Sequence, residues 1–311
     1  MNAFNWERRG LLVEPGFGTA GFSHASHPVV VPRGEGNYLL IFSMRDQNKQ
    51  SHLFSSSISV TQGKIELVNS ATLRLSPGEK GTFDSEGLLG CCAVSTDNGE
   101  LLYYTGWNNL GDGSWLCDTG LATVSPETGE IARKFAGPVM SRGVANPLFA
   151  AGTSVIMESG KFRSWYNRGI SWVINPQGQS VARYGIFYAE SEDGIDWQYS
   201  GQQSIQFLDE QEHSFGRPCV VRLESGYHMW FGHRGSESNP LYRLGYAESA
   251  DGITWSRNDK QAGIEPSGRV GDFDCNAVTY PYAFRHRESL FMVYNGDGYG
   301  ATGIGYAVTK L

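Results

Sequence analysis

The chain has 311 residues, of which 40 % are hydrophobic and 18 % charged, and its formal net charge at pH 7 is −7. An acidic chain without runs of Lys or Arg does not suit phosphate backbones, so nucleic acid is not an expected partner. No run of about 18 apolar residues occurs, which argues against a membrane-spanning helix. Met1–Gly10 lacks the apolar core of a signal peptide. The five cysteines show neither metal nor disulfide spacing, which favours reduced thiols in a cytoplasmic protein.

Two nearly identical segments reveal an internal repeat. Ser191–Trp197 and Ser249–Trp255 both read Ser-x-Asp-Gly-Ile-x-Trp, and each follows a similar lead-in, Tyr184–Glu190 or Tyr242–Glu248. Asp-Gly suits the positive φ of a tight hairpin turn. We expect these segments to shape turns, with the tryptophan packing between neighbouring repeats, and not to bind ligand.

The repeat extends through the whole chain as units of several short strands. In chain order, strand pairs joined by a turn are predicted to begin at Pro28, Cys91, Thr153, Pro218 and Pro281, which lie 63, 62, 65 and 63 residues apart. Third strands are predicted at His52–Ser59, Thr119–Ser125, Tyr184–Glu190, Tyr242–Glu248 and Thr302–Val308. Fourth strands are predicted at Lys64–Val68, Glu130–Phe135, Trp197–Tyr199 and Trp255–Arg257.

The last unit has no fourth strand of its own. Asn5–Gly10 copies the Trp-start of the other fourth strands and is expected to pair near Tyr306, which would leave no exposed sheet edge. The prediction is an all-β single domain over residues 1–311, with almost no helix. Its architecture is a five-bladed β-propeller with four-stranded antiparallel blades, the ring being closed by the N-terminal strand.

Polar residues gather where the predicted first strands begin. Seven residues before the five unit starts stand Gly21, Asp84, Asn146, Gln211 and Asp274. Antiparallel connections place these lead-ins and the ends of the second strands on one face, around the mouth of the central channel. Carboxylates, amides and aromatic rings in one place suit a carbohydrate, and cleavage of a glycosidic bond needs two carboxyl groups. The arginines there suggest an anionic or phosphorylated sugar, because guanidinium groups bind such anions in a bidentate way.

Several stretches resemble the five-bladed propeller glycosidases, the superfamily of arabinanases, xylosidases, invertases, levansucrases and mannoside phosphorylases. The resemblance covers essentially the whole chain and is closest to a bacterial subgroup of uncharacterised glycosidase-like propellers often encoded near polysaccharide genes. It is carried by Tyr188–Trp197, Glu212–Pro218, Tyr227–Trp230 and Tyr294–Gly300 with Gly303. It implies a hydrolase or phosphorylase acting on glycosyl bonds in polysaccharide metabolism.

The chain departs from the superfamily pattern at the expected catalytic positions. Members usually carry an Asp before the first inner strand, but Phe22–Pro28 contains no carboxylate, and Asn146 replaces the Asp of the third blade. Glu212 matches the acidic residue of the fourth blade, though not in offset. Carboxylates stand instead in the second and fifth blades, so either the chemistry has moved around the ring or the usual triad is lost.

The leading hypothesis is an enzyme that cleaves or transfers a glycosidic bond in the central channel. Glu212 is the predicted general acid, Asp84 or Asp274 the base or nucleophile, and Glu86 the group that tunes the pair. The predicted substrate-binding residues are Arg45, Asp46, His27, Trp107, Asn146, Trp165, Arg217, His233, Arg234, Tyr280 and Asn295.

Two alternatives remain open. The missing first-blade Asp favours a non-catalytic carbohydrate-binding propeller, which would be indicated if no two carboxyls lie about 5 to 9.5 Å apart around an open pocket. A metal ion at the channel centre, calcium being usual in the superfamily, would be held by His24, His27 or His213. Otherwise no metal and no cofactor is expected.

Overall fold

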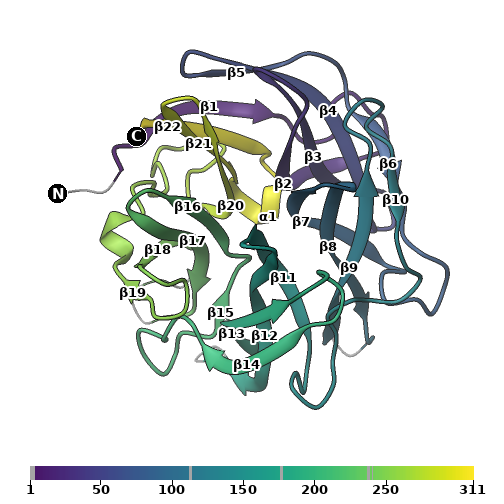
Figure 1. Ribbon diagram of the computed structural model, residues 1–311, viewed down its shortest axis with the longest axis vertical. Coiled ribbons are helices and arrows are strands. Elements are labelled where there is room, and N and C mark those ends of the chain that lie inside the picture. Colours follow the sequence, from purple (N-terminus) through teal and green to yellow (C-terminus); the bar gives the residue numbers. More distant parts are fainter. Residues whose placement is uncertain (1–3, 112–113, 176–177, 237–238, 240) are drawn as a thin grey trace.

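The computed structural model describes residues 4–111, 114–175, 178–236, 239 and 241–311. Within them, the antiparallel strand pairs can be followed as five consecutive groups around a central axis (Figure 1), of which the first four are linked by single parallel residue pairs and the last is a separate four-stranded sheet. Group 1 contains β2 (Ser23–Pro32), β3 (Asn37–Arg45), β4 (Ser51–Thr61), β5 (Lys64–Leu67) and β6 (Thr72–Leu75); group 2 contains β7 (Gly87–Thr96), β8 (Gly99–Asn109), β9 (Trp115–Val124) and β10 (Ile131–Arg133); group 3 contains β11 (Ala150–Glu158), β12 (Lys161–Ile174), β13 (Ser180–Ser191) and β14 (Gln198–Gln203).

The last two groups follow the same order. Group 4 contains β15 (Ser214–Phe215), β16 (Cys219–Leu223), β17 (Gly226–Arg234), β18 (Arg243–Ser249) and β19 (Ser256–Arg257); group 5 contains β20 (Thr279–His286), β21 (Ser289–Asn295), β22 (Ile304–Lys310) and β1 (Glu7–Val13). The helical segments of the described chain are the 3-10 turn η1 (Asp259–Gln261) and the four-residue α1 (Asp297–Gly300). The nearly all-β prediction is therefore confirmed. No helix in the described parts is long and apolar enough to cross a membrane.

The N-terminal strand completes the last group, as the sequence predicted. β1 pairs antiparallel with β22, with Glu7 opposite Val308 and Gly10 opposite Tyr306. Trp6, just before β1, is buried against Trp230 and Phe4 in the apolar cluster shared by groups 4 and 5. The first and last segments of the chain are thus held in one sheet, which covers the edge that β22 would otherwise expose.

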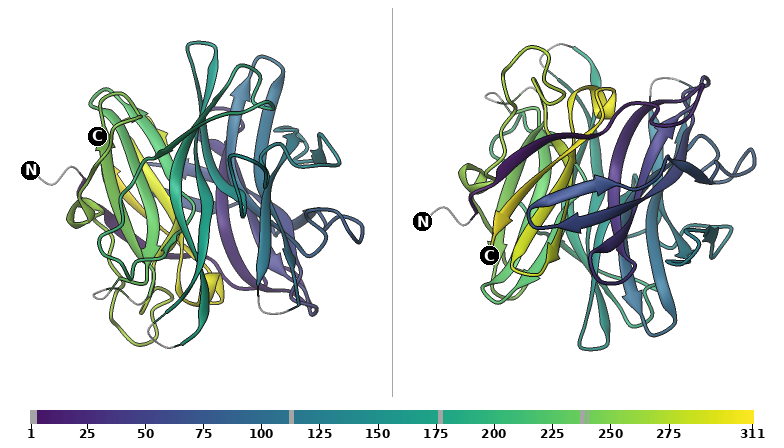
Figure 2. Two further views of the ribbon diagram at one scale, coloured as in Figure 1. Left: turned by 90° about the horizontal axis from the view of Figure 1, so that it is seen from below. Right: turned by 90° about the horizontal axis from the view of Figure 1, so that it is seen from above.

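The first strand of each group lies nearest the axis. β2, β7, β11, β16 and β20 contact one another in this order, and β20 contacts β2 again. Side views show the strands running between two faces, with the connecting loops at both ends (Figure 2). The core is correspondingly divided into apolar clusters between neighbouring groups: groups 1 and 2, 2 and 3, 3 and 4, 4 and 5, and 5 and 1 each share one.

The Asp-Gly segments form turns that fasten one group to the one before it. In each turn the first serine and the aspartate cap backbone N–H groups, and the glycine has a φ of 74° or 75°. The carbonyl of Gly194 accepts a hydrogen bond from Tyr103 in group 2, at 2.8 Å. The carbonyl of Gly252 accepts one from Trp165 in group 3, also at 2.8 Å. The structural role predicted for these segments is confirmed.

Candidate functional site: a cationic, aromatic cavity at the ring centre

A cavity of about 350 Å³ opens where the first strands converge. Its walls come from all five groups and combine cations, aromatic rings and small polar groups. The lining residues are His27, Arg45, Leu89, Cys91, Thr105, Trp107, Asn109, Ser114, Trp115, Cys117, Phe149, Ala151, Gly152, Asn167, Tyr184, Gly216, Arg217, Arg234, Tyr242, Tyr280 and Tyr299. None of these described lining residues is an aspartate or a glutamate.

One repeat position shapes the bottom of the cavity. The residue just before each predicted unit start is His27, Gly90, Gly152, Arg217 or Tyr280. The ladder with the second strand is interrupted at this position in four groups, and in group 4 the first strand is split into β15 and β16. Such bulges re-aim side chains, here toward the axis. The side chains of His27, Arg217 and Tyr280 line one part of the cavity, and Gly152 lines another.

His27 and Tyr280 hold a costly backbone conformation at this position. Their φ values are 52° and 50°, in the left-handed region that residues with a Cβ rarely adopt. Each such residue costs on the order of 1–3 kcal/mol, and strain of this kind concentrates at functional sites. The two rings pack together with centroids 3.8 Å apart. The Oδ1 of Asn295 accepts a hydrogen bond from the His27 backbone N–H, which fixes this arrangement.

Arg217 is a buried cation that pairs with no carboxylate of the described residues. Its side chain donates to four backbone carbonyls, those of Gly90, Pro28, Tyr280 and Pro281, at 2.7 to 3.1 Å. Within the described parts of the chain, its Nε is buried without a hydrogen-bond partner and no carboxylate forms an ion pair with it. Only 2 % of the residue is exposed. Carbonyl dipoles compensate part of the charge, but a buried guanidinium normally faces an anion.

Arg234 extends the positive charge across the cavity wall. Its Nη1 donates to the Tyr299 hydroxyl at 2.8 Å, and its guanidinium lies 4.8 Å from the ring centroid of Tyr242. Its Nε is also buried and has no hydrogen-bond partner among the described residues. The hydroxyls of Tyr184 and Tyr242 lie 3.0 Å apart, and burial raises the pKa of Tyr184 to about 12. Burial also raises the pKa of Tyr242 well above its ordinary value, so Tyr184 and Tyr242 are neutral at pH 7 and do not balance the charge of the arginine.

The electrostatic state of His27 reflects the same positive field. Burial lowers the pKa of this imidazole well below its ordinary value, and the charges of Arg217 and Arg45 lower it further. His27 is therefore neutral at pH 7, able to donate one hydrogen bond and accept another. Arg45, Arg217 and Arg234, none of which pairs with a described carboxylate, line the cavity together with neutral His27. An anion bound there would satisfy the unpaired donors.

Aromatic rings from groups 2 and 3 also line the cavity. Trp115 lies 5.1 Å from Phe149 and 6.1 Å from Tyr184, measured between ring centroids. Trp107 lines the same cavity at the end of β8. Faces of this kind pack against the C–H surfaces of a ligand while leaving its polar edges free.

Among the predicted binding residues, the structure brings six together in the cavity: His27, Arg45, Trp107, Arg217, Arg234 and Tyr280. Sequence reasoning missed Tyr184, Tyr242 and Tyr299, although the first two stand at the same offset in the two most similar repeats. That repeat signal could have identified them. Trp115 and Phe149 carry no such signal.

The four predicted catalytic carboxyls do not line the cavity. Asp84 is 1 % exposed, and its Oδ2 accepts hydrogen bonds from Tyr104 at 3.1 Å and Arg133 at 2.8 Å. Tyr104 belongs to the second strand of group 2 and Arg133 to the fourth. The carboxylate thus joins the strands of its own group.

Asp274 repeats this arrangement in group 5. Its Oδ2 accepts from Tyr294 at 3.0 Å and from Arg8 at 3.2 Å, again from the second and fourth strands. In group 3 Asn146 stands at the same position and accepts from Tyr166 at 2.9 Å. The recurrence of one brace at equivalent positions favours a structural role for these side chains. Their catalytic and binding roles remain predictions.

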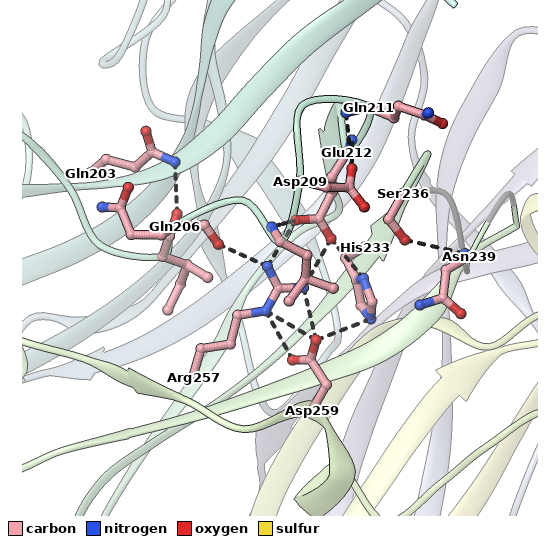
Figure 3. Close-up of polar contacts among 12 residues, drawn as sticks. Gln203, Gln206, Asp209, Gln211, Glu212, His233, Ser236, Asn239, Arg257 and Asp259 are labelled. Atoms are coloured by element: carbon pink, nitrogen blue, oxygen red, sulfur yellow. Dashed lines mark hydrogen bonds and ion pairs between the residues drawn. The ribbon is translucent and has the colours of Figure 1, made fainter. Parts of the chain in front are cut away.

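Glu212 is fully buried in a saturated network (Figure 3). Its Oε1 bonds to His233 Nδ1 and Arg257 Nη2, both at 2.9 Å, and its Oε2 accepts from Leu208 N at 2.7 Å and Arg257 Nη1 at 2.8 Å. Arg257 also pairs with Asp259 at 2.8 Å. Burial alone would raise the pKa of Glu212, but the bonds from Arg257 and His233 lower it to about 2. The predicted general acid is thus ionised at neutral pH in this structure.

The remaining predicted residues lie beside the cavity or in the core. Asp46 Oδ1 accepts from the backbone of Asn48 and Gln50 and caps the turn after β3. Glu86 lies next to Trp107, outside the main cavity. Trp165 is buried between groups 3 and 4. Asn295 accepts a hydrogen bond from the backbone N–H of His27 and does not line the cavity.

A metal site finds little support in these residues. No group of three or more His, Cys, Asp or Glu in the described parts of the chain is placed to hold an ion. Calcium requires oxygen ligands, usually several carboxylates, whereas His27 is flanked by the charges of Arg217 and Arg45. The cavity therefore does not fit a calcium ion.

The Glu212 network makes stability dependent on pH in acid. The folded-state pKa is about 2, against an ordinary value of 4.5, so ionised Glu212 stabilises the fold fully above about pH 4.5. This contribution, about 3 kcal/mol, is expected to disappear as the pH falls from 4.5 towards 2. Urea unfolding of wild type and Glu212→Gln at pH 7 and pH 3 measures it. The difference between the two proteins should shrink at pH 3; a constant difference would contradict the assignment.

The amino-acid sequence was compared with family models and with curated proteins. No family model matches the chain. Two uncharacterized proteins of Mycobacterium tuberculosis, MT1551 and Rv1502, are each 33 % identical over 307 residues, covering 98 % of this chain and 99 % of theirs.

Solved structures share the fold at low identity. One described as a glycoside hydrolase superposes with a TM-score of 0.73 at 16 % identity, covering 98 % of this chain and 91 % of that chain. Another comes from the GH130 family of mannoside phosphorylases, which contains glycoside hydrolases that target β-1,2 mannosidic linkages in Candida mannan. Its TM-score is 0.71 at 13 % identity, with 99 % and 93 % covered. The chain therefore belongs to the family of these mycobacterial proteins and shares its fold with the solved glycoside hydrolase structures.

Proposed function

We propose that this protein binds an anionic saccharide, carboxylated or phosphorylated, in the cavity at the centre of a five-bladed β-propeller. The five strand groups are the blades of that propeller, and residues 1–311 form one domain. The five cysteines are free thiols, which supports a reducing, cytoplasmic location. Polysaccharide metabolism in a bacterium is the setting that the family resemblance suggests.

One observation carries this proposal. Arg217 and Arg234 line the cavity with buried Nε donors that have no described partner, and neither arginine pairs with a carboxylate. Buried donors are rarely left unpaired in folded proteins, and an unpaired buried charge is costlier still. A carboxylate or phosphate oxygen would satisfy both groups. The aromatic wall supports a sugar as the carrier of that anion.

A second function, cleavage or transfer of a glycosidic bond, is favoured by the shared fold of glycoside hydrolases and phosphorylases. The described cavity lining holds no carboxyl, which does not suit a two-carboxylate mechanism and supports the binding-module alternative. Phosphorolysis fits the lining better than hydrolysis, because the arginines would hold phosphate as the nucleophile. Neutral His27 would then hydrogen-bond to the substrate.

The test is a binding panel measured by calorimetry at two ionic strengths. Inorganic phosphate, glucose 6-phosphate, galacturonate and neutral glucose are titrated into the protein. At least one anionic sugar is expected to bind tenfold or more tightly than glucose, and its affinity should fall as salt rises. Equal affinity for neutral and anionic sugars, or no binding of any acidic sugar, would overturn the proposal. Parallel assays with oligosaccharides, with and without phosphate, detect turnover.

A further inference from the structure

A second cavity adjoins the central one. It has a volume of about 400 Å³ and lies between the turn after β3 and the segment before β7. Trp107 and Asn109 line both cavities, so the two spaces share a wall. The residues that line this outer cavity are Asn48, Lys49, Gln50, Glu86, Trp107 and Asn109.

The shared tryptophan is held in place by the backbone beneath it. Gly87 pairs with Trp107 across β7 and β8, and a Cβ at position 87 would lie 2.1 Å from the indole Nε1. Only glycine therefore lets the indole pack directly on the strand. A rigid, partly exposed aromatic ring between two polar cavities is suited to stacking against a sugar ring.

Glu86 supplies the outer cavity with an oriented carboxylate. Its Oε2 accepts a hydrogen bond from the Asn109 backbone N–H at 2.7 Å, and its own N–H donates to the Trp107 carbonyl at 3.3 Å. In contrast to Asp84 and Glu212, it forms no ion pair within the described parts of the chain. Its remaining acceptor sites are therefore available to hydroxyl groups of a ligand.

The turn after β3 supplies the other polar groups. Asp46 caps this turn through the backbone N–H groups of Asn48 and Gln50, and Lys49 takes a φ of 64° within it. The cap fixes the segment that lines the outer cavity, which gives Asp46 an indirect role at the site. Amides, one ammonium and one carboxylate around an indole suit a hydroxyl-rich, neutral group, whereas the central cavity suits an anion.

We propose that the outer cavity is a second saccharide subsite and that the ligand is at least a disaccharide. Its anionic residue occupies the central cavity, and the next residue stacks on Trp107 with hydroxyls bonded to Glu86 and the turn amides. This inference rests on the proposed function, since it needs an anionic sugar in the central cavity. Beyond that function, the inference specifies a minimum length for the ligand. It also specifies that the ligand extends outward from the central cavity between groups 1 and 2.

The experiment compares mono- and disaccharides that carry the same acidic group. Calorimetry measures galacturonate against digalacturonate, and glucose 6-phosphate against trehalose 6-phosphate, on wild type, Trp107→Ala and Lys49→Gln. At least one disaccharide should bind wild type tenfold or more tightly than its monosaccharide. Trp107→Ala should remove most of this advantage, and Lys49→Gln should reduce it severalfold. Lys260→Gln, which removes an exposed lysine elsewhere, should leave the ratio unchanged.

The possible results distinguish failure of the second subsite from failure of the proposed function. If acidic monosaccharides bind but no disaccharide gains affinity, or if Trp107→Ala preserves the gain, the subsite is refuted and the proposed function stands. If no acidic sugar of either length binds, both are refuted. Thermal unfolding of each variant shows whether Trp107→Ala has merely lost the fold; Lys49→Gln, at an exposed turn, tests the subsite independently of that risk.

Discussion

Replacing Glu212 with glutamine is expected to lower the free energy of unfolding by about 3 kcal/mol. The substitution keeps the shape of the side chain but removes the negative charge that faces Arg257 and His233. Removing one partner of a buried ion pair typically costs about 3–5 kcal/mol, because the other charge is left uncompensated. Urea unfolding at pH 7 measures the change.

Glu210→Gln is the matched control for this experiment. It makes the same substitution two residues away at an exposed position, and we expect its free energy of unfolding to stay within about 0.5 kcal/mol of wild type. A Glu212→Gln protein of unchanged stability that has lost saccharide turnover would contradict the structural role. That result would instead support the general acid predicted from the sequence.

Replacing Arg234 with glutamine is expected to weaken binding of an anionic saccharide by about 10- to 100-fold. Hydrogen bonds to charged groups contribute about 1.5–3 kcal/mol each, and the variant removes a cation that no described carboxylate neutralises. Arg234 is only partly buried and forms no ion pair with a described carboxylate, so its removal should lower the free energy of unfolding by little more than the loss of its hydrogen bond to Tyr299. Calorimetry with the best anionic sugar of the panel, together with urea unfolding, measures both quantities.

The control here is Arg269→Gln, which removes an equal charge from an exposed side chain paired with Asp272 at 3.4 Å. Its effect on sugar affinity should be small and should vanish at high salt. If both variants weaken binding equally, the anion is attracted by the overall charge and not held by Arg234. If Arg234→Gln leaves the affinity intact, the central cavity is not the anion site.

The order of the strands along the chain could be predicted from the sequence alone. Spacing of the unit starts and the Ser-x-Asp-Gly segments predicted first, second, third and fourth strands that the structure contains, and placed Asn5–Gly10 against β22. These strands could be predicted because polar–apolar alternation, turn residues and equal spacing are visible in short stretches of sequence. β6, which pairs with β4 as an extra segment, has no counterpart in the other groups and was not predicted.

The spacing of the repeat did not predict which polar residues before the unit starts reach the cavity. Asp84, Asp274 and Glu212 were selected because they are carboxylates at the expected rim, yet each contacts an arginine from the fourth strand of its own group. His27, Arg217 and Tyr280 stand only one residue before the unit starts, and they reach the cavity. A shift of a few residues thus decides between a brace within one group and a place at the axis.

The sequence by itself determined the repeat, the all-β fold and the closing role of the N-terminal strand, because these depend on periodicity and local turn chemistry. Only the tertiary structure decided which charges are paired. Whether a carboxylate meets an arginine depends on strands about 50 to 270 residues apart, as with Asp84 and Arg133 or Asp274 and Arg8. That pairing leaves the central cavity, as far as it is described, with arginines and no carboxylate, and so points to an anionic ligand.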